Sequence, residues 1–496
     1  MRTLRSLVLI TVDCLRADHV GFSGYDRKTT PFLDKLASES RVLRNAIVAG
    51  APTYHSFPAI MASRYPLSLG RDVVGLAPEE TTLATTLKEL GYPTAAFLAG
   101  NPYLSPRFGY DAGFDTFQDF LRAEPPALPL NGAETGMRGR LNRRLADVCH
   151  KLGPAGSVYD ELYFQYCQRV RAHQGASLDT LRRFPAADVI VDHAAVWLRG
   201  IAGGRGPFFL WLHFMDPHAP YYPSEKSLER TGNSTFVASR ARYVNSFWKR
   251  SDLSAARLAR HRDEVIALYD AGIRWVDAQI ARLVDTLRQL NLWGSTIMAV
   301  TADHGEEFLD HGGRYHSPAK VTEELVRVPL LIRVPDIKNT EPAKGTFSLI
   351  HLAPTLLESV GATSPPQFRG RSHWTTLQGN KDWEGEAIIE CVSGCSNPFL
   401  ASNRLGPRIL GIREDRYKLA VDFGSSSDQL FDLSRDPREL HPLLSSEEKP
   451  VRRRLLQRAH RHLADSVVSR NSNHRLAAQL RDLQLEWAGS SLRIPN

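Results

Sequence analysis

Four short segments of this sequence carry side chains whose types and spacing could do metal or acid–base chemistry. The densest is Asp303-His304-Gly305-Glu306, where a carboxylate and an imidazole stand side by side directly after an apolar run. His311 and His316 follow within a few residues. Buried carboxyl and imidazole groups need partners, and together they are ligands that suit zinc or manganese. The segment therefore predicts a divalent metal site.

Two further segments offer a ligand and a nucleophile. Asp13 directly follows the apolar run 6–12, where a carboxylate can cap the next turn or bind a cation. Thr53 precedes an apolar turn and can be an ordinary N-cap. A hydroxyl at a helix N-terminus also suits phosphate chemistry, because free N–H groups and the helix dipole stabilise an anion there. For either residue taken alone, capping is the better explanation.

The fourth segment, 214–221, holds His218 between two prolines that make the turn rigid. A single histidine is more often structural than catalytic, so His218 gains weight only beside the other three segments. Each segment stands just after a predicted strand. In open α/β sheets, sites form in the crevice beyond the carboxyl ends of the strands, and we expect the four segments to meet there.

The elements that must position these residues are apolar runs separated by helical patterns. The predicted strands are 6–12, 94–98, 207–214, 295–301 and 328–334. Residues 264–290 place apolar side chains at three- and four-residue steps, which predicts a long amphipathic helix. Strands that alternate with long helices predict an α/β fold with a mixed, mostly parallel sheet flanked by helices.

At 496 residues the chain is longer than one ordinary domain requires. We expect a catalytic α/β domain over 1–365, with insertions at about 122–186 and 223–258, where the alternation of strands and helices is lost. A C-terminal antiparallel α+β subdomain over 380–496 would end in a basic helical tail. Its predicted strands are 386–391, 408–413, 417–421 and 429–433.

The composition is that of an ordinary globular protein, with 42% hydrophobic and 23% charged residues. A net charge of +8 favours anionic partners but is weak support for nucleic-acid binding, which we do not expect. No run approaches the ~20 apolar residues of a membrane span. The chain has five cysteines, an odd number that does not favour a framework of paired disulfides. We expect a soluble, cytoplasmic protein without a membrane span or a disulfide framework; the oligomeric state stays open.

Together the four segments resemble the sulfatase family of the alkaline-phosphatase superfamily, and the likeness extends over nearly the whole chain. The segments that carry it are Val12-Asp13-Cys14-Leu15-Arg16-Ala17-Asp18, the ungapped spacing from Thr53 to Arg64-Tyr65-Pro66, Asp303-His304-Gly305-Glu306, and Arg327-Val328-Pro329-Leu330. Ala353-Pro354-Thr355-Leu356-Leu357 resembles the final core helix of the family, and Leu430-Phe431-Asp432-Leu433 resembles its C-terminal subdomain.

This resemblance implies a metal centre with a nucleophile in it. Asp13, Asp303 and His304 would hold a divalent ion (Mn²⁺, Zn²⁺, Mg²⁺ or Ca²⁺; one ion or two), and the Thr53 oxygen would complete its shell. A divalent cation makes an alkoxide available near neutral pH and neutralises charge on an anionic ester. Thr53 would then attack phosphorus and form a phospho-Thr intermediate.

The resemblance also assigns roles to residues around the centre. His218 and His316 match positions that hold substrate or a second metal in related phosphoethanolamine transferases, and either can protonate the leaving oxygen. Arg16, His311 and Lys320 are expected to support the ligands or contact substrate.

The sequence departs from the family at the nucleophile. Sulfatases use formylglycine made from Cys or Ser in a Cys-x-Pro-x-Arg pattern, whereas this chain has Thr53, His55 and Phe57 at those three positions. A threonine side chain cannot become an aldehyde. Cys14 takes the place of a second acidic ligand, and the family's lysine position falls on Pro318.

Threonine at this position is shared with phosphoethanolamine transferases and lipoteichoic acid synthases. We therefore predict a metal-dependent hydrolase or transferase of phosphate mono- or diesters. The substrate would be a small anionic ester, such as a phosphorylated or sulfated saccharide or a lipid head group. A sulfuric-ester hydrolase without formylglycine and a non-catalytic relative that binds metal or anions are the alternatives.

Overall fold

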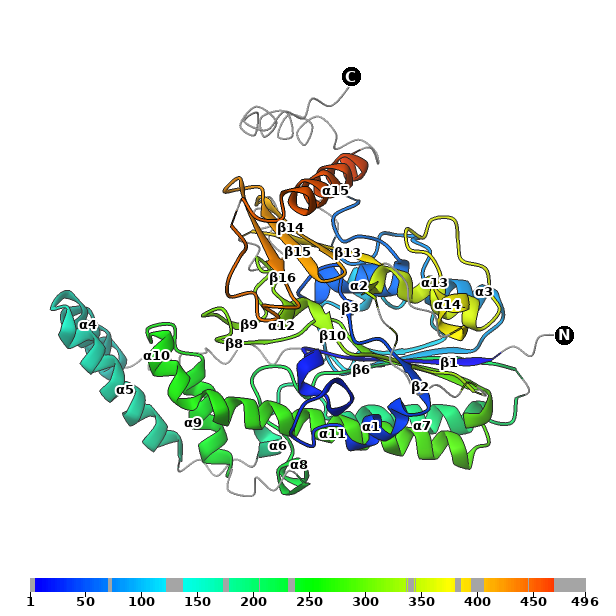
Figure 1. Cartoon of the computed structure of the whole chain (residues 1–496). Coiled ribbons are helices and arrows are strands. Elements are labelled where there is room, and N and C mark those ends of the chain that lie inside the picture. Colours follow the sequence, from blue (N-terminus) through cyan, green and yellow to red (C-terminus); the bar gives the residue numbers. More distant parts are fainter. Residues whose placement is uncertain are drawn as a thin grey trace.

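The computed structural model describes residues 5–69, 74–121, 137–172, 178–204, 206–230, 237–335, 337, 343, 345–379, 385–393, 406–444 and 446–467. Within them lies a seven-stranded sheet in the order β2-β11-β7-β1-β6-β4-β5 (Figure 1). Its strands are β1 Ser6–Val12, β2 Ser40–Val42, β4 Thr94–Leu98, β5 Thr116–Gln118, β6 Phe209–Phe214, β7 Thr296–Ala302 and β11 Leu330–Arg333. β1 pairs in parallel with β6 and β7, and β11 runs antiparallel to β7.

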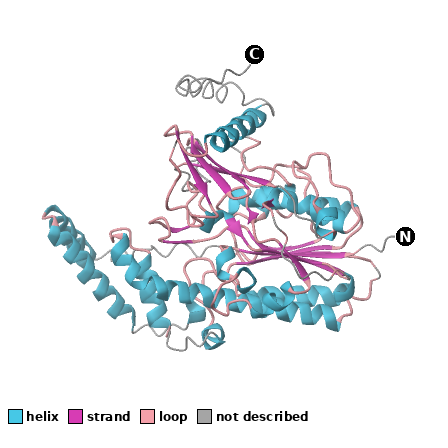
Figure 2. Cartoon of the chain, viewed as in Figure 1, coloured by secondary structure: helices cyan, strands magenta, loops and turns pink. Residues whose placement is uncertain are grey.

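Helices cover both faces of this sheet (Figures 1 and 2). On one face lie α1 Pro31–Ala37, α7 Ala187–Ile201 and α11 Arg262–Gln289, and on the other lie α2 Thr53–Ala62, α3 Leu83–Glu89, α13 Leu352–Ser359 and α14 Trp374–Gln378. β1, β6 and β7 are buried along their whole length. Coverage on both faces explains why these strands read as continuous apolar runs.

The predicted fold class is confirmed. Each predicted strand of the main sheet overlaps an observed one, and the amphipathic segment 264–290 is α11. Sequence patterns did not reveal β2 and β5, because three residues are too few to show a period.

The two regions predicted as insertions are largely helical where the structure describes them. They contain α4 Met137–Lys151, α5 Pro154–Ala172, α6 Leu178–Leu181, α8 Glu225–Arg230, α9 Ala238–Trp248 and α10 Ala255–Leu258. α4 and α5 form a hairpin that projects from the body (Figure 1). The Phe164 ring on α5 packs against Tyr243 and Phe247 on α9, and Arg250 pairs with Glu161. These contacts fasten the base of the hairpin.

A second, antiparallel sheet follows the main sheet along the chain. It consists of β13 Glu386–Val392, β14 Arg408–Glu414, β15 Tyr417–Asp422 and β16 Ser427–Asp432, covered by α15 Lys449–Val467. Leu455, Ala459 and Leu463 of α15 share a buried cluster with Leu410 and Leu419 of the sheet. These strands are where the sequence predicts them. The tail beyond residue 467 lies outside the described residues.

Short strands form two further small sheets, β10-β3-β12 and β8-β9, and α12 precedes β10. The bounds of these elements are β3 Ala46–Ile47, β8 Glu307–Phe308, β9 Arg314–Tyr315, α12 Glu323–Val326, β10 Arg327–Val328 and β12 Phe347–Ser348. A buried ion pair joins Lys418 of β15 to Glu323 of α12, with Nζ and Oε1 3.1 Å apart. No helix in the described ranges combines the length and apolarity needed to cross a membrane.

Candidate active site

The main sheet brings together the ends of two neighbouring strands, β1 and β7. Asp13 follows β1, and Asp303 and His304 follow β7; because β1 and β7 are parallel, their carboxyl ends meet at the same edge. His304 Nε2 lies 3.6 Å from Asp13 Oδ1 and 3.6 Å from Asp303 Oδ2. Thr53 Oγ1 is 3.3 Å from the same nitrogen. We call Asp13, Thr53, Asp303 and His304 the Asp13 centre.

Thr53 is not the cap of its helix. α2 begins at Thr53 itself, and its N-cap is Pro52, with no side-chain hydrogen bond to the helix end. The capping explanation for Thr53 is therefore wrong. Its hydroxyl, held at the first turn of a helix that is buried throughout, is free to face His304.

The two carboxylates of the centre are fully buried, and no Lys or Arg of the described residues forms an ion pair with either. Asp303 Oδ2 makes no hydrogen bond of ordinary geometry. Burial and the charge of Asp13 raise the pKa of Asp303 to about 8. Burial opposes ionisation of Asp13 too, but His218, His213 and His304 outweigh it and hold the pKa of Asp13 well below its usual range. The pKa values of the two carboxyl groups are thus shifted in opposite directions, as expected for two acids buried close together.

His304 is oriented as a ligand. Its Nδ1 donates to the Gly305 carbonyl oxygen at 2.8 Å, which leaves the Nε2 lone pair facing the centre. Burial and the neighbouring His316 lower the pKa of His304 to about 4, so the ring is neutral, as a metal ligand must be. Two carboxylates, a neutral imidazole and a hydroxyl fit a divalent cation.

Sequence reasoning missed two residues that hold Asp13 in place. Asn101 Nδ2 donates to Asp13 Oδ2 at 2.8 Å, and His213 Nε2 lies 3.4 Å from the same oxygen. Asn101 follows β4 and His213 lies in β6. In the sequence, Asn101 is a polar residue shortly after a predicted strand, and His213 is a lone histidine inside an apolar run. These features could have indicated both residues.

The predicted catalytic histidines lie beside the centre. The ring centroid of His316 is 4.6 Å from that of His304 and 5.0 Å from that of His218. His316 Nδ1 donates to Glu306 Oε2 at 3.2 Å. Burial lowers the pKa of His218, whereas Glu306 outweighs burial and raises the pKa of His316. Of the two imidazoles, His316 is the better proton donor.

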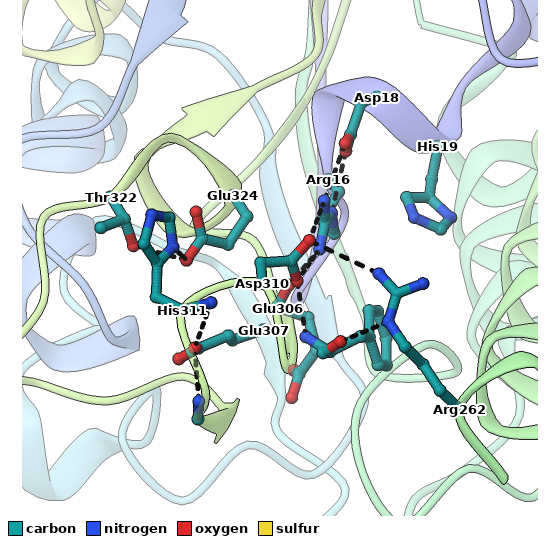
Figure 3. Close-up of polar contacts among 12 residues, drawn as sticks. Arg16, Asp18, His19, Arg262, Glu306, Glu307, Asp310, His311, Thr322 and Glu324 are labelled. Carbon is teal, nitrogen blue, oxygen red and sulfur yellow. Dashed lines mark hydrogen bonds and ion pairs between the residues drawn. The ribbon is translucent and has the colours of Figure 1, made fainter. Parts of the chain in front are cut away.

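Arg16 holds the segment that follows Asp303 and His304 by several hydrogen bonds. Its guanidinium donates to Asp18 Oδ2 at 2.7 Å and to Asp310 Oδ2 at 2.8 Å, and its Nη1 donates to the Glu306 carbonyl oxygen at 3.0 Å (Figure 3). Arg16 is buried. The N–H groups of the Arg16 guanidinium are therefore engaged by partners within the protein.

His311 and Lys320 lie in a neighbouring group, which we call the Glu307 cluster: Glu307, His311, Lys320 and Glu324. His311 Nδ1 contacts Glu324 Oε1 at 2.9 Å (Figure 3). Lys320 Nζ lies 2.8 and 2.7 Å from the two carboxylate oxygens of Glu307. Both side chains are engaged away from the Asp13 centre, and their role toward substrate stays a prediction.

Comparison with known proteins gives two matching family descriptions: Sulfatase over residues 5–362 and N-sulphoglucosamine sulphohydrolase, C-terminal, over residues 314–465. Arylsulfatase K of Xenopus laevis is 28% identical over 275 residues, covering 50% of this chain and 51% of the relative. The chain thus matches about half the length of the arylsulfatase K relatives. Arylsulfatase of Clostridium perfringens (strain 13 / Type A) is 23% identical over 489 residues, covering 89% and 91%.

Solved structures share the fold. Phosphonate monoester hydrolase of Agrobacterium radiobacter superposes with a TM-score of 0.63 at 18% identity, over 93% of this chain and 95% of that one. A protein solved with its substrate D-glucosamine-2-N,6-O-disulfate gives a TM-score of 0.63 at 16% identity, over 94% and 98%. At such identities the likeness concerns the fold alone.

Proposed function

The chain belongs to the sulfatase family, and we propose that it hydrolyses phosphate and phosphonate esters with Thr53 as the nucleophile of a metal centre. The arrangement of Thr53 supports this proposal most strongly: its hydroxyl faces His304 beside two buried carboxylates that pair with no Lys or Arg of the described residues. A threonine hydroxyl that only capped a helix would not need two buried carboxylates and an imidazole beside it.

Asp13, Asp303, His304 and Thr53 are the residues that would hold the ion. When bound, a divalent ion lowers the pKa of a bound hydroxyl and neutralises charge on the ester. The Thr53 oxygen attacks phosphorus in line and loses its proton to solvent. The bond from phosphorus to the leaving oxygen breaks, and its electron pair stays on that oxygen, which takes a proton from His316. Water then attacks phosphorus and cleaves the phospho-Thr ester; a proton of that water restores the Thr53 hydroxyl, and His316 regains its proton from solvent.

Threonine favours phosphorus over sulfur as the electrophile. Its side chain cannot form the hydrated aldehyde of formylglycine, so the usual sulfatase route is closed. A phospho-Thr ester, in contrast, can be hydrolysed at phosphorus while the Thr53 Cβ–Oγ1 bond stays intact. The fold shared with a phosphonate monoester hydrolase adds phosphonates to the candidate substrates.

Sulfate-ester hydrolysis is the second candidate, because curated relatives of this chain include arylsulfatases. The two candidates are separated by assaying the full chain with aryl phosphate mono- and diesters, an aryl phosphonate monoester and an aryl sulfate. Each assay is run with Mn²⁺, Zn²⁺, Mg²⁺ or Ca²⁺. Turnover of the phosphorus esters is expected, with Thr53→Ala inactive and Thr53→Ser partly active. Turnover of the sulfate alone would overturn the phosphorus assignment.

A further inference from the structure

One residue of the second sheet, Glu390 of β13, contacts the chain on both sides of the helix that begins with Thr53. Before α2, the Ala49 carbonyl oxygen accepts a hydrogen bond from the Glu390 backbone N–H at 2.7 Å. After α2, the Glu390 Oε2 atom accepts a hydrogen bond from the Leu67 backbone N–H at 2.8 Å. Glu390 is fully buried. We call residues 49–67 the nucleophile segment; both of its ends are thus bound to Glu390.

The nucleophile segment and β13 approach each other closely just before Thr53. A Cβ atom at Gly50 would lie 2.6 Å from the Glu390 carbonyl oxygen, which is closer than a side-chain carbon can come to backbone without a shift. Glycine permits this close approach of two backbones. The next residue along β13 also takes part, because the Cys391 thiol donates to the Ala51 carbonyl oxygen at 3.6 Å. A shift of β13 would therefore displace the backbone that leads into Thr53.

His462 of α15 in turn holds the Glu390 carboxylate. Its Nε2 donates to Glu390 Oε1 at 2.7 Å, and its ring packs edge-on against Tyr65 with the ring centroids 4.6 Å apart. Burial raises the pKa of Glu390, but His462, the charge of Arg408 and the Leu67 N–H outweigh burial and lower this pKa below its usual range. Hydrogen bonds to an ionised carboxylate are the short and strong ones, so His462 fixes the position of Glu390.

We propose that Glu390 is a positioning residue for the Thr53 nucleophile, and that His462 of α15 keeps the Glu390 carboxylate in place. The proposal rests on the proposed function, because it takes Thr53 as the attacking group. Both residues act through the backbone of the nucleophile segment and not on the ester itself. A displacement of about 1 Å in a reacting group can cost ~10²-fold in rate. The C-terminal helix α15 therefore contributes to kcat through the position of Thr53.

Two substitutions at one position test this proposal in the full chain. His462→Phe keeps a ring beside Tyr65 but removes the N–H donor, whereas His462→Gln keeps an N–H donor without the ring. Both kcat and KM are measured on the ester that the unmodified protein hydrolyses best. We expect His462→Phe to lower kcat by ~10-fold or more with KM nearly unchanged, because the lost interaction acts in the transition state. His462→Gln should restore most of kcat.

Leu455→Ala is the matched control for a loss of stability alone. Leu455 belongs to the buried cluster between α15 and the second sheet, so its truncation should lower the melting temperature. Its kcat per folded chain should stay that of the unmodified protein. An unchanged kcat in His462→Phe, or an equal loss of kcat in Leu455→Ala, would overturn the proposal.

Hydrogen–deuterium exchange gives a reading that needs no substrate. Amides of residues 49–67 should exchange faster in His462→Phe than in the unmodified protein or Leu455→Ala, because local protection reports local stability. Unchanged exchange would overturn the proposal. If His462→Phe does not fold, Glu390→Gln is used, which keeps an oxygen for Leu67 but weakens the contact with His462. Its kcat should fall severalfold, and an unchanged kcat would contradict us. Absence of turnover of every ester by the unmodified protein would count against the proposed function instead.

Discussion

Asp303 and His304 of the Asp13 centre directly follow β7, and the residues of the Glu307 cluster come next in the chain. Both groups contain the side-chain types of a metal site. They differ in charge balance. In the Glu307 cluster, the Lys320 ammonium already neutralises the Glu307 carboxylate. In the Asp13 centre, two buried carboxylates share a neutral imidazole and an alcohol. A count of ligand types does not separate the two groups, but a Lys partner is present in one and none is found for the other among the described residues. On that ground we propose the cation site at the Asp13 centre.

The largest expected contrast is in catalysis. Asp303→Asn removes a ligand and should lower kcat/KM by ~10³-fold or more. Glu307→Gln keeps an oxygen for the backbone N–H groups of His311 and Gly313 and should stay within about tenfold of the unmodified protein. Steady-state kinetics of both variants on the best ester decide the matter. Equal losses would mean that the distinction between the two groups is false.

Removal of metal should separate the two groups by stability. An ion present at about 100 times its Kd stabilises the folded state by about 2.7 kcal/mol, which is a few degrees of melting temperature for a chain of this size. A chelator should therefore lower the melting temperature of the unmodified protein and of Glu307→Gln. Asp303→Asn should show little change. A chelator shift of the same size in Asp303→Asn would place the ion elsewhere.

Arg16 links the two groups, because it holds the Glu306 carbonyl oxygen and the Asp310 carboxylate between them. Arg16→Met leaves Asp310 without this partner and should lower the free energy of unfolding by about 2 kcal/mol. Arg16→Lys keeps the positive charge but not the branched set of N–H donors, and its free energy of unfolding should fall by less. Urea unfolding midpoints measure both. No loss in Arg16→Met would show that the loop is held by other contacts.

The smallest effect belongs to the Glu307 cluster. The hydrogen bond to Glu324 raises the pKa of His311 above its ordinary 6.5. The stabilisation from protonated His311 is therefore complete below about pH 6.5 and is lost as pH rises through the raised value. His311 is half-buried, so we expect less than about 1 kcal/mol. The free energy of unfolding, measured across this pH range, should lack this pH-dependent part in His311→Gln, because glutamine does not titrate. The same pH dependence in both proteins would show that His311 is not its source.

Much of this architecture was predictable from sequence. The buried strands β1, β6 and β7 are long apolar runs, and the residues that follow a strand at its carboxyl end belong to the candidate site. Asp13, Asp303 and His304 were named on that ground and Thr53 as a hydroxyl at a helix N-terminus, and the structure brings the four together. Their roles as ligands and nucleophile stay proposals.

The remaining details depend on tertiary packing. His311 and His316 follow His304 at similar sequence distances, yet the hairpin of β8 and β9 directs one to Glu324 and the other to the Asp13 centre. No local pattern distinguishes them. Asn101 and His213 reach Asp13 because β6 lies beside β1 and β4 lies beside β6 in the sheet, and strand order is not visible in the sequence.

The central claim is that the Thr53 alcohol, activated in the Asp13 centre, carries the transferred group. Rapid acid quenching during turnover of an aryl phosphate, followed by peptide mass spectrometry, tests it directly. We expect a peptide heavier by about 80 Da with the added mass on Thr53, as a phosphoryl-enzyme intermediate requires, and no such peptide from Thr53→Ala. Unchanged turnover by Thr53→Ala, or an adduct on another residue, would contradict the account.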